Sequence, residues 1–288
     1  MTSAGEPPLG LIAGDGRLPL LAARGARRAG RRVIVLGIRG FASPRLAGLA
    51  DEFLWVGLTR VGAWLRALRR RGIRQAVLVG GVRKREMYSP WRFWRHLPDL
   101  RTARIWYGKV RRDRRDNAVL LALAEELASE GVELMSSVEY CKEHLAVEGL
   151  MTRTPVPAAA GGDLDFGWRI ARASADLDIG QSVAVHDGDI IAVEAIEGTD
   201  EMILRAGRLC PRAGWTLVKV ARPRQDMRFD VPTVGPETLR NLKAAGCACL
   251  LLEAGRTLIV DKPVTLELAD RLGIAVLGRR AEGAPSDR

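Results

Sequence analysis

The sequence contains 288 residues with a formal net charge of +11; 47% of its residues are hydrophobic and 27% are charged. This composition is typical of a globular protein, and the length is sufficient for two domains of ordinary size. No run of about eighteen apolar residues is present, so we expect no membrane span. The first eight residues lack a secretory signal, so a cytoplasmic location is expected. The positive charge predicts an anionic partner, which could be a nucleic acid, a nucleotide substrate or an anionic membrane surface.

The cysteines and histidines do not form a metal-binding pattern. Cys247 and Cys249 lie within an apolar run and are expected to pack in the core, while Cys141 and Cys210 stand apart. The histidines are separated from the cysteines and from one another. We therefore expect no zinc site.

The first half of the chain alternates short apolar runs with helical patterns. Expected strands cover residues 9–13, 32–37, 53–57, 76–82 and 132–135, and expected helices cover 17–28, 61–71 and 119–130. Strands that alternate with helices in this way predict an α/β unit with a parallel sheet.

Glycine-rich turns follow two of these strands. Gly14-Asp15-Gly16 ends the first strand, and Gly80-Gly81 ends the fourth. Open α/β sheets bind ligands at the carboxyl ends of their strands, so the first turn either holds a phosphate or is a tight turn without a ligand. Pro19 occupies the third glycine position of the dinucleotide-binding pattern, and no acidic residue follows the second strand. A nicotinamide cofactor is therefore disfavoured.

A basic and aromatic region extends over residues 83–116. It contains twelve basic and four acidic residues, interspersed with six aromatic ones. This mixture suits binding to nucleic acid or to an anionic membrane interface. It is equally compatible with a solvated arginine face whose aromatic side chains lie in the core.

A change in composition divides the chain. Residues 151–165 contain two prolines and paired glycines, which predicts a linker between domains at residues 1–150 and 166–288. The second domain is expected to be an α/β unit with a mixed sheet, and its tail is expected to be disordered from about residue 279. Its expected elements are helices 166–176, 199 onward, 236–245 and 264–272, a hairpin of 179–185 with 190–193, strand 216–220, a second hairpin of 249–252 with 257–260, and strand 275–277.

The acidic stretch from Ile190 to Met202 is the most informative part of the second half. Glu194, Glu197 and Asp200 lie around a strand-to-helix turn, where carboxylates could hold a hard cation. Thr199 or Asp200 could cap the following helix and leave backbone N–H groups for an anion. Asp230 lies in a similar setting, followed closely by proline and glycine. Together these features suggest metal-assisted phosphate chemistry.

In this order and spacing the motifs resemble the metal-dependent UDP-2,3-diacylglucosamine pyrophosphatases of bacterial lipid A synthesis. The matching pieces, which extend over nearly the whole chain, are LGLIAGDGRLP (9–19), the 80–82 strand end, DIGQ (178–181), AVEAIEGTD (192–200), DVPTVG (230–235) and EAGRTLIVD (253–261). Two departures from the family pattern are Gly81, where asparagine is expected, and Asp116-Asn117, in the place of a paired acidic motif.

This resemblance implies hydrolysis of a lipid-linked nucleotide sugar to UMP and 2,3-diacylglucosamine 1-phosphate (lipid X), with Mg²⁺ or another divalent cation. It also implies a Rossmann-like N-terminal domain and a distinct C-terminal α/β domain, with the lipid product between them. Water is expected to attack the glucosamine-side phosphate. Asp230 is expected to be catalytic and to bind the metal, with Glu197 and Asp200 as further metal ligands.

The remaining candidate site residues are expected to bind substrate. They are Gly14, Asp15, Gly16, Gly80, Gly81, Gln181, Gly198, Thr199, Lys219, Thr233 and Gly235. Lys219 would neutralise a phosphate. Two alternatives remain open, in which Asp200 only caps a helix and Glu194 forms an internal ion pair.

The lipid substrate gives the basic and aromatic region a purpose. We expect Trp91, Arg92, Trp94 and Arg95 to associate peripherally with the anionic inner membrane. No nucleic-acid recognition motif is present, so a nucleic-acid partner is not expected. Assembly into a homo-oligomer is compatible with the sequence. The main alternative function is a non-enzymatic lipid or nucleotide-sugar binding protein that uses the same interdomain pocket.

Overall fold

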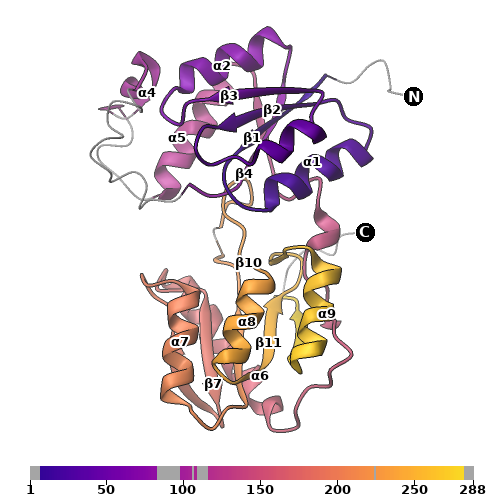
Figure 1. The fold of residues 1–288 in the computed structure, drawn as a ribbon. Coiled ribbons are helices and arrows are strands. Elements are labelled where there is room, and N and C mark those ends of the chain that lie inside the picture. The colour runs from indigo at the N-terminus through magenta and orange to yellow at the C-terminus, as the bar shows by residue number, and fades with distance from the viewer. Residues whose placement is uncertain (1–6, 83–97, 106, 109–115, 224, 282–288) are drawn as a thin grey trace. The chain divides into compact units, whose positions relative to one another are not determined.

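The computed structural model describes residues 7–82, 98–105, 107–108, 116–223 and 225–281. The chain forms two compact units, which are described separately below (Figure 1). Unit 1 consists of residues 1–141 with Met227–Phe229, and unit 2 consists of residues 142–226 with residues 230–288. The expectation of an α/β protein with one parallel sheet and one mixed sheet is confirmed.

Unit 1 is built on a five-stranded sheet in the order β3-β2-β1-β4-β5. All neighbouring strands are parallel. The strands are β1 (Leu9–Ala13), β2 (Val33–Ile38), β3 (Glu52–Val56), β4 (Gln75–Val79) and β5 (Glu133–Met135). The connections between the first four strands each contain a helix, as parallel pairing requires.

Both faces of this sheet are buried. Leu9, Leu11 and Ala13 point to a core that includes side chains of α1 (Leu18–Arg28). Ile12 belongs to the core on the opposite face, with side chains of α2 (Val61–Arg70) and α5 (Asp116–Ser129). Because successive strand residues point to opposite faces, continuous apolar strands need a cover on both sides. The 3-10 helix η1 (Pro44–Leu49) completes the first cover with Leu46 and Leu49.

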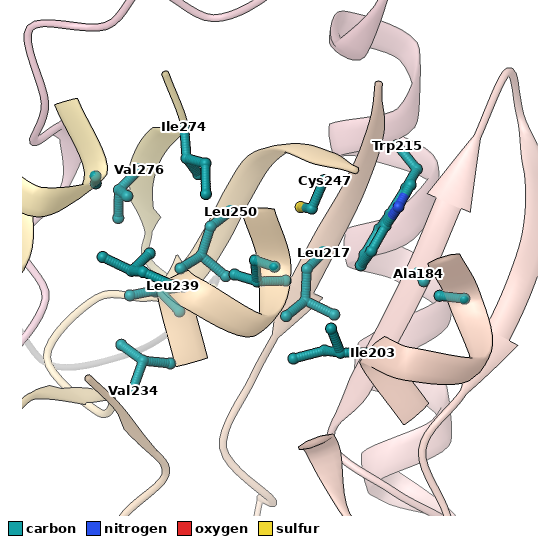
Figure 2. Packing of buried hydrophobic residues seen from close by; sticks show 14 of the residues in the cluster. Ala184, Ile203, Trp215, Leu217, Val234, Leu239, Cys247, Leu250, Ile274 and Val276 are labelled. Atoms are coloured by element: carbon teal, nitrogen blue, oxygen red, sulfur yellow. The ribbon is translucent and has the colours of Figure 1, made fainter. Parts of the chain in front are cut away.

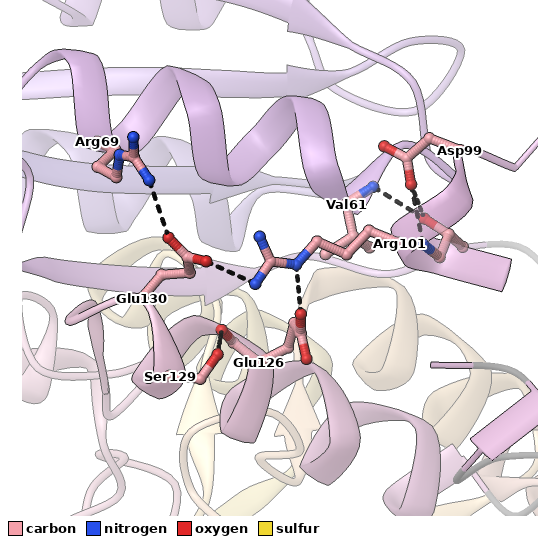
Figure 3. A network of polar contacts seen from close by, with 8 residues as sticks. Val61, Arg69, Asp99, Arg101, Glu126, Ser129 and Glu130 are labelled. Atoms are coloured by element: carbon pink, nitrogen blue, oxygen red, sulfur yellow. Dashed lines mark hydrogen bonds and ion pairs between the residues drawn. The ribbon is translucent and has the colours of Figure 1, made fainter. Parts of the chain in front are cut away.

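A polar network attaches α4 (Leu100–Ile105) to its neighbours in unit 1 (Figure 3). The guanidinium of Arg101 donates to Glu126 and to Glu130, both on or next to α5. Thr102 accepts the backbone N–H of Val61 at 3.0 Å, at the first residue of α2. None of the α4 side chains is fully buried, and Ile105 packs against the core only as a partly buried residue, so these polar contacts contribute to holding the helix.

Unit 2 contains a six-stranded mixed sheet in the order β6-β13-β11-β9-β7-β8. Its strands are β6 (Gly149–Leu150), β7 (Ser182–His186), β8 (Asp189–Val193), β9 (Trp215–Lys219), β11 (Cys247–Glu253) and β13 (Ala275–Arg279). Strands β9, β11 and β13 are parallel, whereas β7 and β8 form the expected antiparallel hairpin. A separate parallel pair joins β10 (Thr233–Val234) and β12 (Leu258–Ile259).

Helices cover both faces of the second sheet as well. The larger core lies under α7 (Thr199–Leu209), α8 (Pro236–Ala244) and α9 (Lys262–Leu272). Figure 2 shows this core, in which Trp215, Leu217 and Leu250 lie beside Ile203 and Leu239 from the helices. The other face packs against α6 (Ala160–Asp176).

The expected second hairpin is wrong. Residues 258–259 pair in parallel with β10, and β11 is not their partner. Strand β11 already has parallel neighbours on both sides, β9 and β13, so it has no free edge for a hairpin return. The turn residues were recognised in the sequence, but the pairing depends on which strand edges remain available.

The proposed linker lies within unit 2, and the division between the units falls between Cys141 and Lys142 rather than near residue 150. Thr154 donates its backbone N–H to Asp270 of α9 at 2.8 Å, and α6 begins at Ala160. Proline and glycine therefore indicate irregular backbone here without a loss of tertiary contact. Strand β13 extends to Arg279, where the tail was expected to begin, and residues 282–288 lie outside the described part of the chain.

Within the described ranges, no helix combines the length and apolar character needed to cross a membrane.

Candidate functional site

In unit 1 the two glycine turns lie against each other at the carboxyl ends of β1 and β4. Asp15 and Gly81 exchange backbone hydrogen bonds of 2.8 and 3.0 Å. A Cβ atom on Gly14 would lie 2.7 Å from the carbonyl oxygen of Gly81, and one on Gly80 would lie 2.6 Å from that of Asp15. Glycine is thus required because two backbones approach closely. The structure brings these four site candidates together, and their role in substrate binding stays a prediction.

Gly16 continues the first turn toward α1. Its φ of +100° is readily accessible only to glycine, and its N–H donates to the Asp15 carboxylate at 2.8 Å. Helix α1 starts without a side-chain cap. Anion binding at this helix start stays a prediction.

In unit 2 a buried polar cluster lies at the carboxyl end of β9. Lys219, the last residue of that strand, donates from Nζ to the hydroxyl of Thr199 at 2.7 Å and to that of Ser182 at 3.4 Å. The Thr199 hydroxyl donates to Oε1 of Glu194 at 3.0 Å. Lys219 is 3% exposed and Glu194 is 7% exposed. The end of β8, the start of α7 and the end of β9 therefore meet at one polar site.

The electrostatics of Lys219 identify the other members of this cluster. Burial lowers the pKa of Lys219, and the carboxylates of Glu194, Asp200 and Asp230 act in the opposite direction. A buried ammonium loses favourable hydration, and nearby negative charge partly offsets that loss. These carboxylates come from different segments, and only the tertiary fold brings them to one amine.

Asp200 and Asp230 are each held by a side-chain amide. Asn241 donates to Oδ1 of Asp200 at 3.1 Å, and Gln225 donates to Oδ2 of Asp230 at 2.7 Å. Asp230 is exposed, so water and ligands reach it. The suggestion that Thr199 or Asp200 caps α7 is wrong, because Gly198 occupies the cap position and no side chain bonds there.

Glu197 has a different environment. Its carboxylate accepts from Arg205 at 2.6 Å and from the backbone N–H of Ala195 at 3.2 Å. A hydrogen bond from its own backbone N–H lowers the pKa of Glu197, and Arg205 lowers it further. This side chain closes the turn between β8 and α7, and within the described ranges no contact joins it to Lys219, Asp200 or Asp230. Its metal-binding role stays a prediction.

The other substrate-binding candidates of unit 2 lie at element ends. Gln181 immediately precedes β7, and its buried Oε1 has no hydrogen-bond partner among the described residues. Gly198, with a φ of +83°, and Gly235 occupy the cap positions of α7 and α8. Thr233 is exposed and donates to the carbonyl of Val231 at 2.9 Å.

The carboxylates do not form an all-protein metal cage. In the part of the chain that the structure describes, no three His, Cys, Asp or Glu side chains are grouped closely enough to hold a metal ion. Mg²⁺ commonly uses only one or two carboxylates, with phosphate oxygens and waters as its other ligands. Asp200 and Asp230 are the candidates for such a site, because both act on the same amine and each is oriented by an amide, and their metal-binding role stays a prediction.

Sequence reasoning assigned no role to several side chains at this site. Ser182, Gln225 and Asn241 contact the predicted residues, and nothing in their sequence context distinguishes them from ordinary polar residues. Glu253 gave a stronger signal, because it follows the apolar run of β11 directly. It is 1% exposed, pairs with Arg172 at 3.1 Å, and accepts the backbone N–H of Ala221 at 2.8 Å.

The sequence matches two protein-family descriptions that together extend over most of the chain. Residues 8–144 match the LpxI N-terminal domain, and residues 147–277 match the LpxI C-terminal domain. A similar curated protein is the UDP-2,3-diacylglucosamine pyrophosphatase LpxI of Caulobacter vibrioides. It is 34% identical over 279 residues, which cover 94% of this chain and 96% of the relative.

The similarity to solved structures is weak. A biotin carboxylase of Campylobacter jejuni is 13% identical with a TM-score of 0.28, covering 72% of this chain and 43% of that one. The protein described as glycinamide-RNase-transformylase T of Mycobacterium tuberculosis is 15% identical with a TM-score of 0.23, covering 65% of this chain and 44% of that one. The chain spans less than half of these proteins, and they carry no functional argument.

Proposed function

The chain belongs to the LpxI family, and from that premise we propose that it hydrolyses UDP-2,3-diacylglucosamine in lipid A biosynthesis. The products are UMP and 2,3-diacylglucosamine 1-phosphate. The observation that carries this proposal is the match to a pyrophosphatase named for that substrate over almost the full length of both chains. The polar cluster of unit 2 supports it, because cleavage of a pyrophosphate needs neutralised phosphate charge and a positioned water.

The expected resemblance to a UDP-2,3-diacylglucosamine pyrophosphatase family is confirmed, but not the metal dependence that was expected with it. The matched names specify no metal, so metal dependence is a separate part of the proposal. Asp200 and Asp230 are the ligands best suited to Mg²⁺, and Glu197 would join them only if its ion pair with Arg205 opened. When bound, the ion would supply positive charge to the phosphate oxygens.

The chain's own residues have distinct tasks in this reaction. Lys219 donates an N–H to a phosphate oxygen and offsets its negative charge. Asp230, which is exposed and held by Gln225, accepts a hydrogen bond from the attacking water and so orients it. The water's oxygen bonds to the glucosamine-side phosphorus, and the bond from that phosphorus to the bridging oxygen breaks, so that UMP leaves.

Two further expectations continue as proposals. We place the enzyme in the cytoplasm, peripherally at the inner membrane, because its substrate carries two acyl chains. The membrane-contacting residues named from the sequence, Trp91, Arg92, Trp94 and Arg95, lie outside the described residues. A homo-oligomer remains compatible with the sequence.

The deciding experiment measures UMP release from UDP-2,3-diacylglucosamine in detergent, with added Mg²⁺ and with excess EDTA. We expect release that depends on the metal and that falls by at least about a hundredfold in Asp230→Ala, since that variant loses the group that orients water. Circular dichroism verifies that the variant is folded. Glu237→Gln, on the exposed first turn of α8, serves as the matched carboxylate control.

The alternative is a non-enzymatic carrier that binds the same lipid or nucleotide sugar. It predicts no UMP release by the wild type under either condition, and instead a co-purified lipid or nucleotide sugar detectable by mass spectrometry. Release that is unaffected by EDTA would reject the metal while retaining the hydrolase. Asp230→Ala turnover near that of the wild type would reject the role of Asp230.

A further inference from the structure

Glu194, Thr199 and Lys219 form a hydrogen-bonded chain across three elements. Thr199 begins α7, Lys219 ends β9, and Glu194 follows β8 directly. The distances are 2.7 Å from Lys219 to Thr199 and 3.0 Å from Thr199 to Glu194. The hydroxyl therefore stands between the amine and this carboxylate.

The direction of this chain is fixed by the chemistry of its members. An ammonium only donates, an ionised carboxylate only accepts, and a hydroxyl has a single hydrogen to give. Because the Thr199 hydroxyl donates its hydrogen to Glu194, its oxygen accepts the hydrogen bond from Lys219. Hydrogen bonds linked in this way polarise one another, and the effect is larger where water is excluded. Through the Thr199 hydroxyl, Glu194 thereby orients the amine of Lys219, to which it makes no hydrogen bond itself.

The ammonium retains a donor after these bonds. Thr199 and Ser182 use two of its three N–H groups, and no acceptor among the described residues bonds to the third. The charged groups that act on Lys219 are Glu194 after β8, Asp200 on α7 and Asp230 before β10. An anionic phosphate oxygen is the acceptor that suits the remaining N–H.

The nearby pair of Glu253 and Arg172 provides a contrast. There the guanidinium contacts the carboxylate directly, and the backbone N–H of Ala221 bonds to the same carboxylate. The buried carboxylate of Glu253 therefore has its hydrogen-bond donors in direct contact. Glu194, in contrast, contacts a hydroxyl, and its buried Oε2 has no hydrogen-bond partner among the described residues. Its position suits a negative charge that orients Lys219 while leaving that amine free to meet a ligand.

The geometry points to Glu194 as a positioning residue that, through the Thr199 hydroxyl, aims the ammonium of Lys219 at a phosphate group of the substrate. This inference rests on the proposed hydrolysis for its kinetic test, although the phosphate recognition that it describes can be measured separately. It adds a residue, Glu194, and assigns to Thr199 a task beyond substrate contact. The third member, Lys219, is the group that touches the substrate.

The kinetic test compares Thr199→Val, Glu194→Gln and the double variant in the full-length protein, with UDP-2,3-diacylglucosamine and Mg²⁺. We expect each single change to lower kcat by between about ten- and a hundredfold, the rate equivalent of one hydrogen bond to a charged group. The double variant should lose no more than the worse single variant, because both changes break one chain. Thr199→Ser, which retains the hydroxyl, should recover most of the lost rate.

Thr216→Val is the matched control. Thr216 is a fully buried residue of β9, the strand that ends in Lys219, and its hydroxyl has no hydrogen-bond partner among the described residues. The same exchange of hydroxyl for methyl there should leave kcat at the wild-type level. A loss of rate in this control equal to that of Thr199→Val would overturn the inference in favour of a general packing effect.

A second readout does not depend on hydrolysis. Calorimetric titration with inorganic pyrophosphate should show affinity lowered at least about fivefold in Thr199→Val, the loss expected for a weakened hydrogen bond to a charged group, with Thr216→Val unchanged. If the wild type releases no UMP, the proposed function fails and this titration alone decides the inference. Pyrophosphate affinity equal in wild type and Thr199→Val, or multiplying losses of kcat in the double variant, would overturn it. If Glu194→Gln does not fold, the comparison of Thr199→Val with Thr199→Ser still decides.

Discussion

The two units end their parallel strands in different ways. In unit 1 the ends of β1 and β4 meet backbone to backbone, and Gly14 and Gly80 there leave no room for side chains. In unit 2 the ends of β9 and β11 carry the buried charged residues Lys219 and Glu253. The carboxyl ends of the parallel strands are thus occupied by closely packed backbone in unit 1 and by buried charged side chains in unit 2. Strand topology locates a candidate site, but the residues at the strand ends decide what it can do.

The largest expected effect on stability concerns the charged strand end of unit 2. Glu253→Ala should lower the free energy of unfolding by about 3–5 kcal/mol, because it leaves the Arg172 partner and the Ala221 N–H without their acceptor. Denaturant titration of the wild type and the variant measures this loss. A loss comparable to that of an exposed pair, such as Arg240 with Glu237, would show that the buried pair is not a stabilising element of this edge.

A smaller effect is expected at the glycine turn of unit 1. Gly14→Ala should destabilise the protein by about 1–3 kcal/mol, since the new Cβ must displace backbone rather than a flexible side chain. Gly48→Ala in η1 is the control, because a Cβ there meets nothing within 4 Å. Equal thermal unfolding midpoints for the two variants would contradict the close approach of the two turns.

The comparison also predicts a dependence of stability on pH that arises in unit 2. Burial lowers the pKa of Lys219 in the folded protein below its ordinary value of 10.5. At a pH between the lowered pKa of the folded state and the ordinary pKa of the unfolded state, Lys219 is protonated in the unfolded chain but not in the folded one. The contribution of Lys219 to the free energy of unfolding therefore rises with pH in that window. Below the folded pKa both states are protonated and this contribution does not change.

Lys219→Met should remove that rise. Urea titrations of the wild type and the variant across the alkaline range, in EDTA so that no metal contributes, measure the difference. Curves that run parallel through the window would show that the folded amine titrates like an ordinary lysine.

Much of the fold could be predicted from the sequence because the local patterns are strong. The strands predicted at 9–13 and 76–82, each with glycines at its carboxyl end, correspond to β1 and β4 and to the turns after them. Helices α2 and α8 begin at Val61 and Pro236, the residues at which the sequence pattern predicted them to begin. The second hairpin failed because pairing depends on available strand edges, and β11 had none.

The candidate site was only partly accessible to the same reasoning. Asp230 and Asp200 were found through motifs and Lys219 as a candidate partner of a phosphate, and the structure places all three in one electrostatic cluster. Glu194 was singled out as an acid, but its bond to Thr199 could not be read from a spacing of five residues across a turn. Ser182, Gln225 and Asn241 gave no signal because each contacts a residue far away in the sequence or across an irregular loop.

The sequence by itself determined most of the longer helices and strands, the α/β class and the family, since these depend on short-range periodicity and on motifs in a fixed order. Tertiary structure alone decided which acids surround Lys219, which hydroxyl it contacts, and that Glu197 instead pairs with Arg205. The physical reason is that burial and hydrogen-bond partners arise from packing between elements distant in the chain. The sequence shows which side chains are charged, but these charges interact strongly only when the fold excludes water and brings the groups together.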